Sequence, residues 1–538
     1  MYVDALYDKA HDRILVAERV NGKRVFREYP AEHVFYYDDP AGKHKTVFGN
    51  QCTRVATRSH KEFQKELRAI KASGKTLYES DFKPVFRCLE SNYRHAEAPK
   101  LHAAFFDIET DFDKERGFAP TEEPFNRVTA VTIYLGWLDQ LVTLVMPPKH
   151  MSDAEAQEIA AQFDNTIVFT NEVQMLGTFL DVIDDADVLT GWNSEGYDIP
   201  YLVNRITMTM SKNDTRRFCL WDQVPSGRLY ERYGTERITF DLVGRVHMDY
   251  MQLYRKYTYE ERHSYSLDAI GEYELNERKT AYEGNLDQLY NNDWRKFIEY
   301  NRQDVMIVAK LDRKLKFLDL ANQLAHENTV LLQTTMGAVA VTEQAIINEA
   351  HERGLIVQNR KGHEEDKETQ AAGAYVAHPK KGLHEWIGSV DINSLYPSVI
   401  RALNMAPETV VGQIRLDLTD QYIAERMAEG LSFAASWEGL FATMEYDLVM
   451  LKDRSQVLIV EWEETGPMEM TGAEIWKLVF DSGSNLILSA NGTIFSLDRA
   501  GVIPGLLERW YAERKQLQAT LKEWIDLSSG IQLPERLL

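Results

Sequence analysis

The run SVDINSLYPSVI, residues 389–400, places an aspartate at the end of an apolar stretch and follows it with a tight polar turn. We expect the apolar part to form a buried strand that ends at Asp391. A carboxylate at a strand end can hold a hard cation, and the backbone N–H groups of the next turn can cradle phosphate oxygens. A lone aspartate at a strand–turn–helix joint is ordinarily a surface residue. The whole pattern from Asp391 to Ser398 favours a phosphoryl-transfer site instead.

Toward the N-terminus, the run FFDIE (residues 105–109) carries two acids two positions apart. In a strand, side chains alternate between the two faces, so Asp107 and Glu109 point to the same side. Two carboxylates on one face repel each other unless a cation neutralises them. The pair is therefore either exposed at a sheet edge or part of a metal site, and its strongly apolar flanks favour the metal site.

Two later segments add further acids. The run GWNSEGYDIP (residues 191–200) contains Asp198, which could also be a simple helix cap. Tyr300 and Asp304 are four residues apart, which places them on one face of a predicted helix. Taken alone, Asp304 could be a solvated acid beside a packed tyrosine. Together the segments supply four carboxylates and a phenol, a set that can hold two metal ions about 3.5–4 Å apart for phosphodiester hydrolysis.

Composition narrows the class of protein. The chain has 538 residues and a formal charge of −22, which is unusual for a nucleic-acid binder because such proteins rely on Lys and Arg. Net charge does not describe a single groove, however. The three cysteines Cys52, Cys88 and Cys219 are far apart, which excludes a disulfide framework or zinc ribbon and fits a reducing cytoplasm. The sequence predicts no membrane-spanning or signal segment.

The hydrophobic pattern predicts a multidomain α/β and α+β chain. Strand-like runs alternate with helices between residues 101 and 335, where one long helix is expected over residues 293–325. The polar stretch 358–375 is the best linker candidate. The final helix is expected over residues 504–526, opened by a proline.

The motif Asp391-x-x-Ser394-Leu395-Tyr396-Pro397-Ser398 resembles the first polymerase motif of family B DNA polymerases, and the surrounding chain resembles their tailed-phage replicative type. This resemblance implies that Asp391 and the carbonyl of Ile392 bind catalytic metals. It implies that Ser394 and Leu395 hold the incoming triphosphate. Tyr396 would then be the steric gate against the ribose 2′-OH, the group that distinguishes RNA from DNA precursors.

The three acidic segments resemble the Exo I, II and III motifs of the RNase H-like 3′–5′ proofreading exonuclease of the same family. By this resemblance the metal ligands are Asp107, Glu109, Asp198 and Asp304. Tyr300 would orient the attacking water, and Lys279 stands where the phage enzymes carry an assisting lysine. The implied cofactors are two Mg²⁺ or Mn²⁺ ions at the exonuclease site, and two more at the polymerase site when that site is complete.

The resemblance also implies a domain order. We expect an N-terminal domain over residues 1–102, to which residues 336–372 return, and an exonuclease domain over residues 103–335. A partial palm domain would follow over residues 373–500, and the first part of the fingers over residues 501–538.

Two motifs of the family, a Lys-x-x-x-Asn-Ser-x-Tyr-Gly helix and a Tyr-Gly-Asp-Thr-Asp-Ser turn, do not occur in this sequence. Arg514 matches a triphosphate-binding arginine of the first fingers helix, but Gln518 replaces the lysine expected one turn later. We therefore expect a split polymerase, completed by a second polypeptide that also provides any sliding-clamp contact. Its substrates would be primer–template DNA and dNTPs in the host cytoplasm. The alternative is a stand-alone 3′–5′ exonuclease that acts on single-stranded or frayed DNA.

Overall fold

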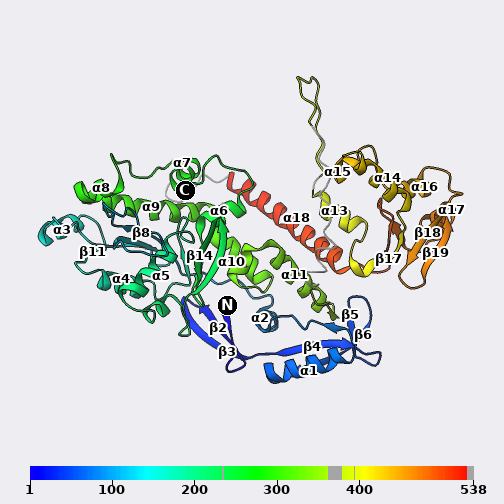
Figure 1. Cartoon of the computed structure of the whole chain (residues 1–538), viewed down its shortest axis with the longest axis horizontal. Coiled ribbons are helices and arrows are strands. Elements are labelled where there is room, and N and C mark those ends of the chain that lie inside the picture. Colours follow the sequence, from blue (N-terminus) through cyan, green and yellow to red (C-terminus); the bar gives the residue numbers. More distant parts are fainter. Residues whose placement is uncertain (233–234, 361–378, 393, 530–538) are drawn as a thin grey trace. The chain divides into compact units, whose positions relative to one another are not determined.

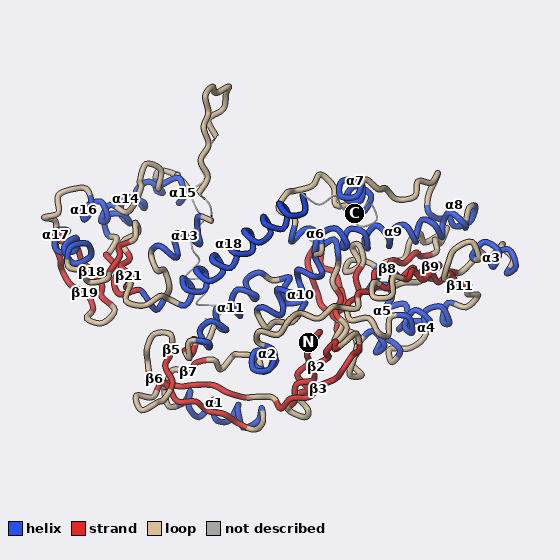
Figure 2. The backbone as a smooth tube through the Cα atoms, turned by 180° about the vertical axis from the view of Figure 1, so that it is seen from behind, coloured by secondary structure: helices blue, strands red, loops and turns tan. Residues whose placement is uncertain are grey.

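The structure, a computed structural model, describes residues 1–232, 235–360, 379–392 and 394–529. The chain divides into two compact units, drawn in Figures 1 and 2. The first unit contains Met1–Val34, Ala56–Arg68 and Phe82–Ala345, and the second contains Phe35–Val55, Ala69–Asp81 and Ile346–Leu538. Among the described residues, no helix is both long and apolar enough to cross a membrane.

The first unit is built on a six-stranded mixed sheet with the order β11-β10-β9-β8-β12-β15. Strand β8 (Ala103–Thr110) lies between β9 (Val128–Leu135), which is antiparallel to it, and β12 (Val188–Thr190), which is parallel. The remaining strands of this sheet are β10 (Gln140–Val145), β11 (Thr166–Val168) and β15 (Val246–His247). Strand β9 pairs with β8 from Ala104 to Thr110, whereas β12 pairs only with Ala103–Phe105. The acid-bearing part of β8 therefore has a strand partner on one side.

The two faces of β8 belong to different hydrophobic clusters. Phe106 and Ile108 pack in the cluster that contains residues of α4 (Glu172–Val182) and α5 (Asp198–Thr209). Phe105 faces the opposite side and packs in the cluster that contains residues of α9 (Trp294–Leu315). Figure 1 shows α9 along one face of the sheet and α4 and α5 on the other. This alternation turns every second residue of β8 toward α9.

Other elements complete the first unit. An antiparallel sheet is formed by β1 (Tyr2–Asp8), β2 (Arg13–Val20) and β3 (Lys23–Pro30), and β13 (Ser226–Arg232) pairs with β14 (Thr235–Asp241) as a hairpin. The further helices are α2 (Pro84–Tyr93), α3 (Asp153–Ala160), α6 (Tyr250–Tyr257), α7 (Leu267–Leu275), α8 (Leu286–Asn292) and α10 (Phe317–Glu327). Two short 3₁₀ helices lie at Asp214–Phe218 and Leu332–Met336. Helix α11 (Ala338–Glu352) has residues in both units.

The prediction of one helix over residues 293–325 is wrong in extent. The helix is broken at Lys316, whose φ of 59° is in the left-handed region and separates α9 from α10. The break lets Phe317 and Leu318 turn into the hydrophobic core beneath α6, where both are buried. Packing of these two side chains thus overrides the helical pattern of the sequence.

The second unit contains two five-stranded sheets. One has the order β16-β5-β6-β4-β7, formed by Leu355–Ile356, His44–Thr46, Gln51–Thr57, His33–Asp38 and Leu77–Tyr78. Helix α1 (His60–Ala72) follows β6 along the chain, and most of its residues fall in the first unit. The other has the order β19-β18-β17-β21-β20, formed by Gly466–Thr471, Val457–Trp462, Val410–Ile414, Thr493–Ser496 and Leu486–Leu488. The pairing of β16 with β5 brings the chain near residue 355 back to an N-terminal strand.

The helices of the second unit include α13 (Leu395–Ala402), α14 (Asp417–Ala428), α15 (Phe433–Ser436), α16 (Met444–Met450), α17 (Gly472–Trp476) and the long α18 (Val502–Ser529). Shorter helical turns lie at Pro407–Thr409 and Lys477–Asp481. The predicted final helix is confirmed as α18, which begins two residues before its expected start at residue 504. From residue 361 onward, the predicted linker lies outside the described residues.

The predicted buried strand that ends at Asp391 is absent from the described chain. Residues 389–392 form no strand, and Val390 and Ile392 are 96% and 61% exposed. A strand needs neighbours that pair with its N–H and C=O groups. No described strand of this unit pairs with this run.

Candidate metal centre

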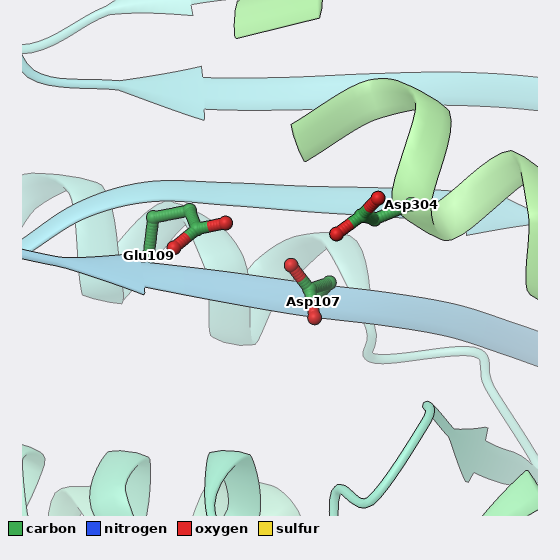
Figure 3. Close-up of side chains that lie close together, drawn as sticks. All are labelled: Asp107, Glu109 and Asp304. Carbon is green, nitrogen blue, oxygen red and sulfur yellow. The ribbon is translucent and has the colours of Figure 1, made fainter. Parts of the chain in front are cut away.

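Three carboxylates from two distant segments meet in the first unit. Oxygen atoms of Asp107, Glu109 and Asp304 all lie within 4.8 Å of one another. Figure 3 shows Asp107 and Glu109 extending from the same side of β8 toward Asp304 on α9. The prediction that the two acids of the FFDIE run share a face is therefore confirmed, and so is the convergence of Asp304 with them.

Asp198, the fourth predicted acid, lies beside this trio. It is the first residue of α5, and its Oδ1 accepts a hydrogen bond from the backbone N–H of Ile108 (3.1 Å), the residue between Asp107 and Glu109. Only 4% of Asp198 is exposed. It is not one of the three acids that lie within 4.8 Å of each other, but its charge is close enough to raise the pKa of Asp107.

Burial and mutual repulsion make these acids hard to ionise. Burial, followed by the charges of Asp198, Glu109 and Asp304, raises the pKa of Asp107 well above its ordinary value. Burial and then Asp304 raise the pKa of Glu109 to about 8. For Asp198, burial raises the pKa to about 7, opposed by the Ile108 N–H bond. A cation bound beside these carboxylates would favour their ionised forms and so lower their pKa values again.

Lys279 and Tyr300 border the acids on the α9 side. The Lys279 ammonium forms an ion pair with Asp304 and donates a hydrogen bond to the Tyr300 hydroxyl (3.1 Å). Burial lowers the pKa of Lys279, but the charge of Asp304 more than compensates, so the net shift is upward. Burial raises the pKa of Tyr300, which keeps its phenol protonated near neutral pH. The structure thus brings both residues to the acids, while their roles stay predictions.

Two buried residues of the centre were missed by the sequence reasoning. Asn301 is fully buried and its Nδ2 donates to Asp107 Oδ2 (2.8 Å). Asp249 accepts hydrogen bonds from the backbone N–H groups of Asn193 and Glu195 (3.1 Å each), which fixes the loop that leads to Asp198. The position of Asn301, three residues before Asp304 on a helix, was an available signal. For Asp249, the sequence offered no signal beyond its position directly before α6.

The donor set fits a divalent cation such as Mg²⁺ or Mn²⁺. Hard cations of this kind prefer carboxylate oxygens, and the trio offers only such atoms. In addition, Asp304 Oδ1 is buried and has no hydrogen-bond partner among the described residues. A buried acceptor without a partner is costly, so this oxygen is suited to a ligand outside the protein chain.

The residues expected at a polymerase site lie in the second unit. Ser394 has a φ of 54° and directly precedes α13, which begins with Leu395. The side chain of Tyr396 is 72% exposed, and Asp391 and Ile392 are also exposed. These residues form no enclosed site in the described chain.

Arg514, the remaining predicted triphosphate contact, lies on α18. It borders a shallow cavity of about 340 Å³ together with Trp510, Leu517 and Gln518. Helix α13 is tied to α18 by an ion pair between Arg401 and Glu508, and Arg401 also lies over the ring of Tyr511 at 4.4 Å. The helix that follows the aspartate motif and the helix that carries Arg514 are thus joined directly.

Comparison with protein families identifies the two parts of the chain. Residues 68–270 match the family model described as DNA polymerase family B, exonuclease domain, and residues 329–536 match that of DNA polymerase family B. The first matched segment contains Asp107, Glu109 and Asp198, whereas Asp304 lies between the two segments. The chain therefore carries an exonuclease domain followed by polymerase-domain sequence. It belongs to the family B DNA polymerases.

Individual relatives agree with this assignment. The chain is 26% identical over 475 residues to the DNA-directed DNA polymerase of Escherichia phage RB69, covering 83% of this chain and 52% of that protein. It is 26% identical to the DNA-directed DNA polymerase of Enterobacteria phage T4, covering 75% and 47%. The match to the DNA polymerase delta catalytic subunit of Bos taurus is 25% identical and covers 73% and 36%. The chain spans about half the length of the two phage relatives.

Proposed function

We propose that this chain is a metal-dependent 3′–5′ exonuclease that removes nucleotides from single-stranded or frayed DNA ends. The observation that carries this proposal is that carboxylate oxygens of Asp107, Glu109 and Asp304 lie within 4.8 Å of one another. Asp107 and Glu109 belong to the segment that matches the exonuclease-domain model. Frayed ends would be preferred because a mismatched base costs less to remove from the stack.

In the proposed mechanism, two divalent cations, Mg²⁺ or Mn²⁺, would be held by Asp107, Glu109, Asp198 and Asp304. When bound, the cations supply an activated water and stabilise charge on the leaving 3′ oxygen. The protonated Tyr300 phenol orients the attacking water, and its hydrogen bond from Lys279 fixes the direction in which the hydroxyl points. Burial raises the pKa of Asp304, and the ion pair with Lys279 opposes that rise.

The proposal is tested with a 3′-labelled single-stranded oligonucleotide, with Mg²⁺ and with a chelator. We expect Asp304→Asn and Asp198→Ala to lose about 100-fold or more of the rate of the natural chain. Asp312→Asn is the matched control, because Asp312 lies on the same helix and bonds Tyr250 and Leu318 instead of the acid cluster. Equal activity in Asp304→Asn and Asp312→Asn, or full activity in chelator, would refute the assignment.

We further propose that the chain adds nucleotides to a DNA primer only when a second polypeptide supplies the rest of the fingers, palm and thumb. Asp391 and the Ile392 carbonyl would then hold two metals together with an acid from that polypeptide. Ser394, Leu395 and Arg514 would hold the triphosphate, and Tyr396 would exclude the ribose 2′-OH. The match of residues 329–536 to the polymerase family supports the polymerase part of this proposal.

The test is primer extension with the chain alone, with a candidate second half, and with the mixture. We expect extension only in the mixture, and its loss in Asp391→Ala. In Tyr396→Ala, incorporation of ribonucleotides should rise relative to deoxyribonucleotides. Extension by the isolated chain, or an inert mixture of two folded halves, would contradict the split arrangement.

The finer architecture follows from the same proposal. We infer an RNase H-like exonuclease domain over residues 103–335, supported by the strand order β10-β9-β8-β12-β15. An N-terminal domain over residues 1–102 would be rejoined by residues 336–372, which the pairing of β16 with β5 supports. Palm and fingers would follow at 373–500 and 501–538. Because the relatives include phage polymerases, we place the protein in the host cytoplasm, with any sliding clamp bound through the second half.

A further inference from the structure

Asn301 connects helix α9 to the acid-bearing strand β8. It lies three residues before Asp304, none of its surface is exposed, and its Nδ2 donates to Asp107 Oδ2 at 2.8 Å. We infer that Asn301 is a positioning residue that fixes the Asp107 carboxylate for cation binding. This inference rests on the proposed exonuclease function, and it assigns a role to a residue that lies outside the four predicted acids.

The chemistry around Asp107 explains why a neutral donor is needed there. The charges of Asp198, Glu109 and Asp304 all act against its ionised form. An ionised carboxylate only accepts hydrogen bonds, so further acids cannot restrain it. An amide N–H can hold one oxygen without adding a positive charge that would compete with the cation. The second oxygen of Asp107 is then left for the metal.

The amide oxygen of Asn301 provides a second observation. Its Oδ1 is buried and, like Oδ1 of Asp304, has no hydrogen-bond partner among the described residues. The two residues lie on the same face of α9. With Nδ2 committed to Asp107, this oxygen can only accept, and water molecules bound to a cation are strong donors. Asn301 would thus contact both a metal ligand and the hydration shell of the metal.

A purely structural role makes a different prediction. If Asn301 only held α9 against β8, its loss would lower the free energy of unfolding without changing cation affinity in the protein that remains folded. Asn322 provides a matched comparison in the same unit. It is 5% exposed, lies on α10, and its Nδ2 donates a single hydrogen bond to the carbonyl of Pro99 at 2.7 Å.

The experiment measures Mn²⁺ binding by electron paramagnetic resonance in the full chain without DNA. We compare the natural chain with Asn301→Leu, Asn301→Ser and the control Asn322→Leu. We expect both Asn301 variants to bind Mn²⁺ about 10–100-fold more weakly, as is typical when a residue that orients a metal ligand is lost. Asn322→Leu should bind as tightly as the natural chain. At saturating Mn²⁺, nuclease activity of the Asn301 variants should recover, whereas Asp107→Ala stays inactive.

Two results would overturn the inference. One is an unchanged Mn²⁺ affinity in either folded Asn301 variant, and the other is an equal loss in Asn322→Leu. Asn301→Ser is included because leucine in this fully buried position could unfold the chain. Absence of Mn²⁺ binding in the natural chain would instead refute the proposed exonuclease function, and with it the role of Asn301, so the two failures are distinguishable.

Discussion

Removing divalent cations should make the stability of the first unit depend on pH in an unusual direction. Burial and Asp304 raise the pKa of Glu109 from 4.5 to about 8, and burial raises that of Asp198 from 3.8 to about 7. At a pH between the ordinary pKa of each acid and its raised pKa, the folded state binds more protons than the unfolded state. The contribution of these groups to stability is therefore complete below about pH 4, and it is lost as the pH rises through about 8. An acid whose pKa is lowered in the folded state, such as Asp113, gives the opposite trend.

The expected size follows from the pKa of Glu109. A change from 4.5 to about 8 corresponds to roughly 5 kcal/mol at 1.36 kcal/mol per pH unit, and Asp198 acts in the same direction. Because the two acids share one site with Lys279, their energies do not add. We expect a net loss of about 3–5 kcal/mol between about pH 5 and pH 8 in chelator. At about 2–4 °C per kcal/mol, the unfolding temperature should fall by roughly 10 °C.

Added Mg²⁺ should reverse this loss, since it binds the ionised carboxylates. At a free concentration of about 100 times its Kd, a cation adds about 2.7 kcal/mol of stability. The assay is differential scanning fluorimetry from pH 5 to pH 8, with chelator and with excess Mg²⁺. Glu109→Gln removes one titrating acid and should flatten both the pH dependence and the Mg²⁺ response. The reasoning fails if the natural chain shows neither effect, or if Glu109→Gln responds to the same extent.

Three further substitutions test separate parts of the structure. Tyr300→Phe should lower the exonuclease rate about 10–100-fold with little change in Mn²⁺ affinity, measured as above, because the phenol is predicted to orient water rather than metal. Lys279→Met removes the main charge that opposes the effect of burial on the pKa of Asp304, so the acidic limb of the pH–rate profile should move to higher pH. Gly412→Ala would place a methyl 2.8 Å from the ring of Trp462 and should cost about 1–3 kcal/mol in the second unit, measured by thermal unfolding, without changing exonuclease activity.

The acidic cluster was largely predictable because its geometry is local. Alternation along a strand fixes the common face of Asp107 and Glu109, and helical periodicity places Tyr300 beside Asp304. What periodicity cannot provide is the contact between the two segments, which depends on α9 packing against β8. The hydrogen bond from Asn301 to Asp107 and the loop held by Asp249 are consequences of that packing, so they emerge only from the coordinates.

Local patterns fail where a single backbone conformation decides the outcome. Lys316 ends α9 in the left-handed region, although lysine is a good helix former and the apolar spacing continues past it. The gain from burying Phe317 and Leu318 outweighs the loss of helical continuity. A sequence window records the preference of each residue for a helix. It does not record the alternative contacts that a break makes available.

Two acid-bearing runs of similar composition differ in secondary structure, because one forms a strand and the other does not. FFDIE lies within β8, where β9 pairs with it along its whole length and β12 pairs with Phe105 at its start. The run at residues 389–392 has the same apolar–acidic character, yet no described strand pairs with it and Val390 is 96% exposed. Apolar composition therefore indicates that a segment is suited to burial, whereas strand formation requires neighbours.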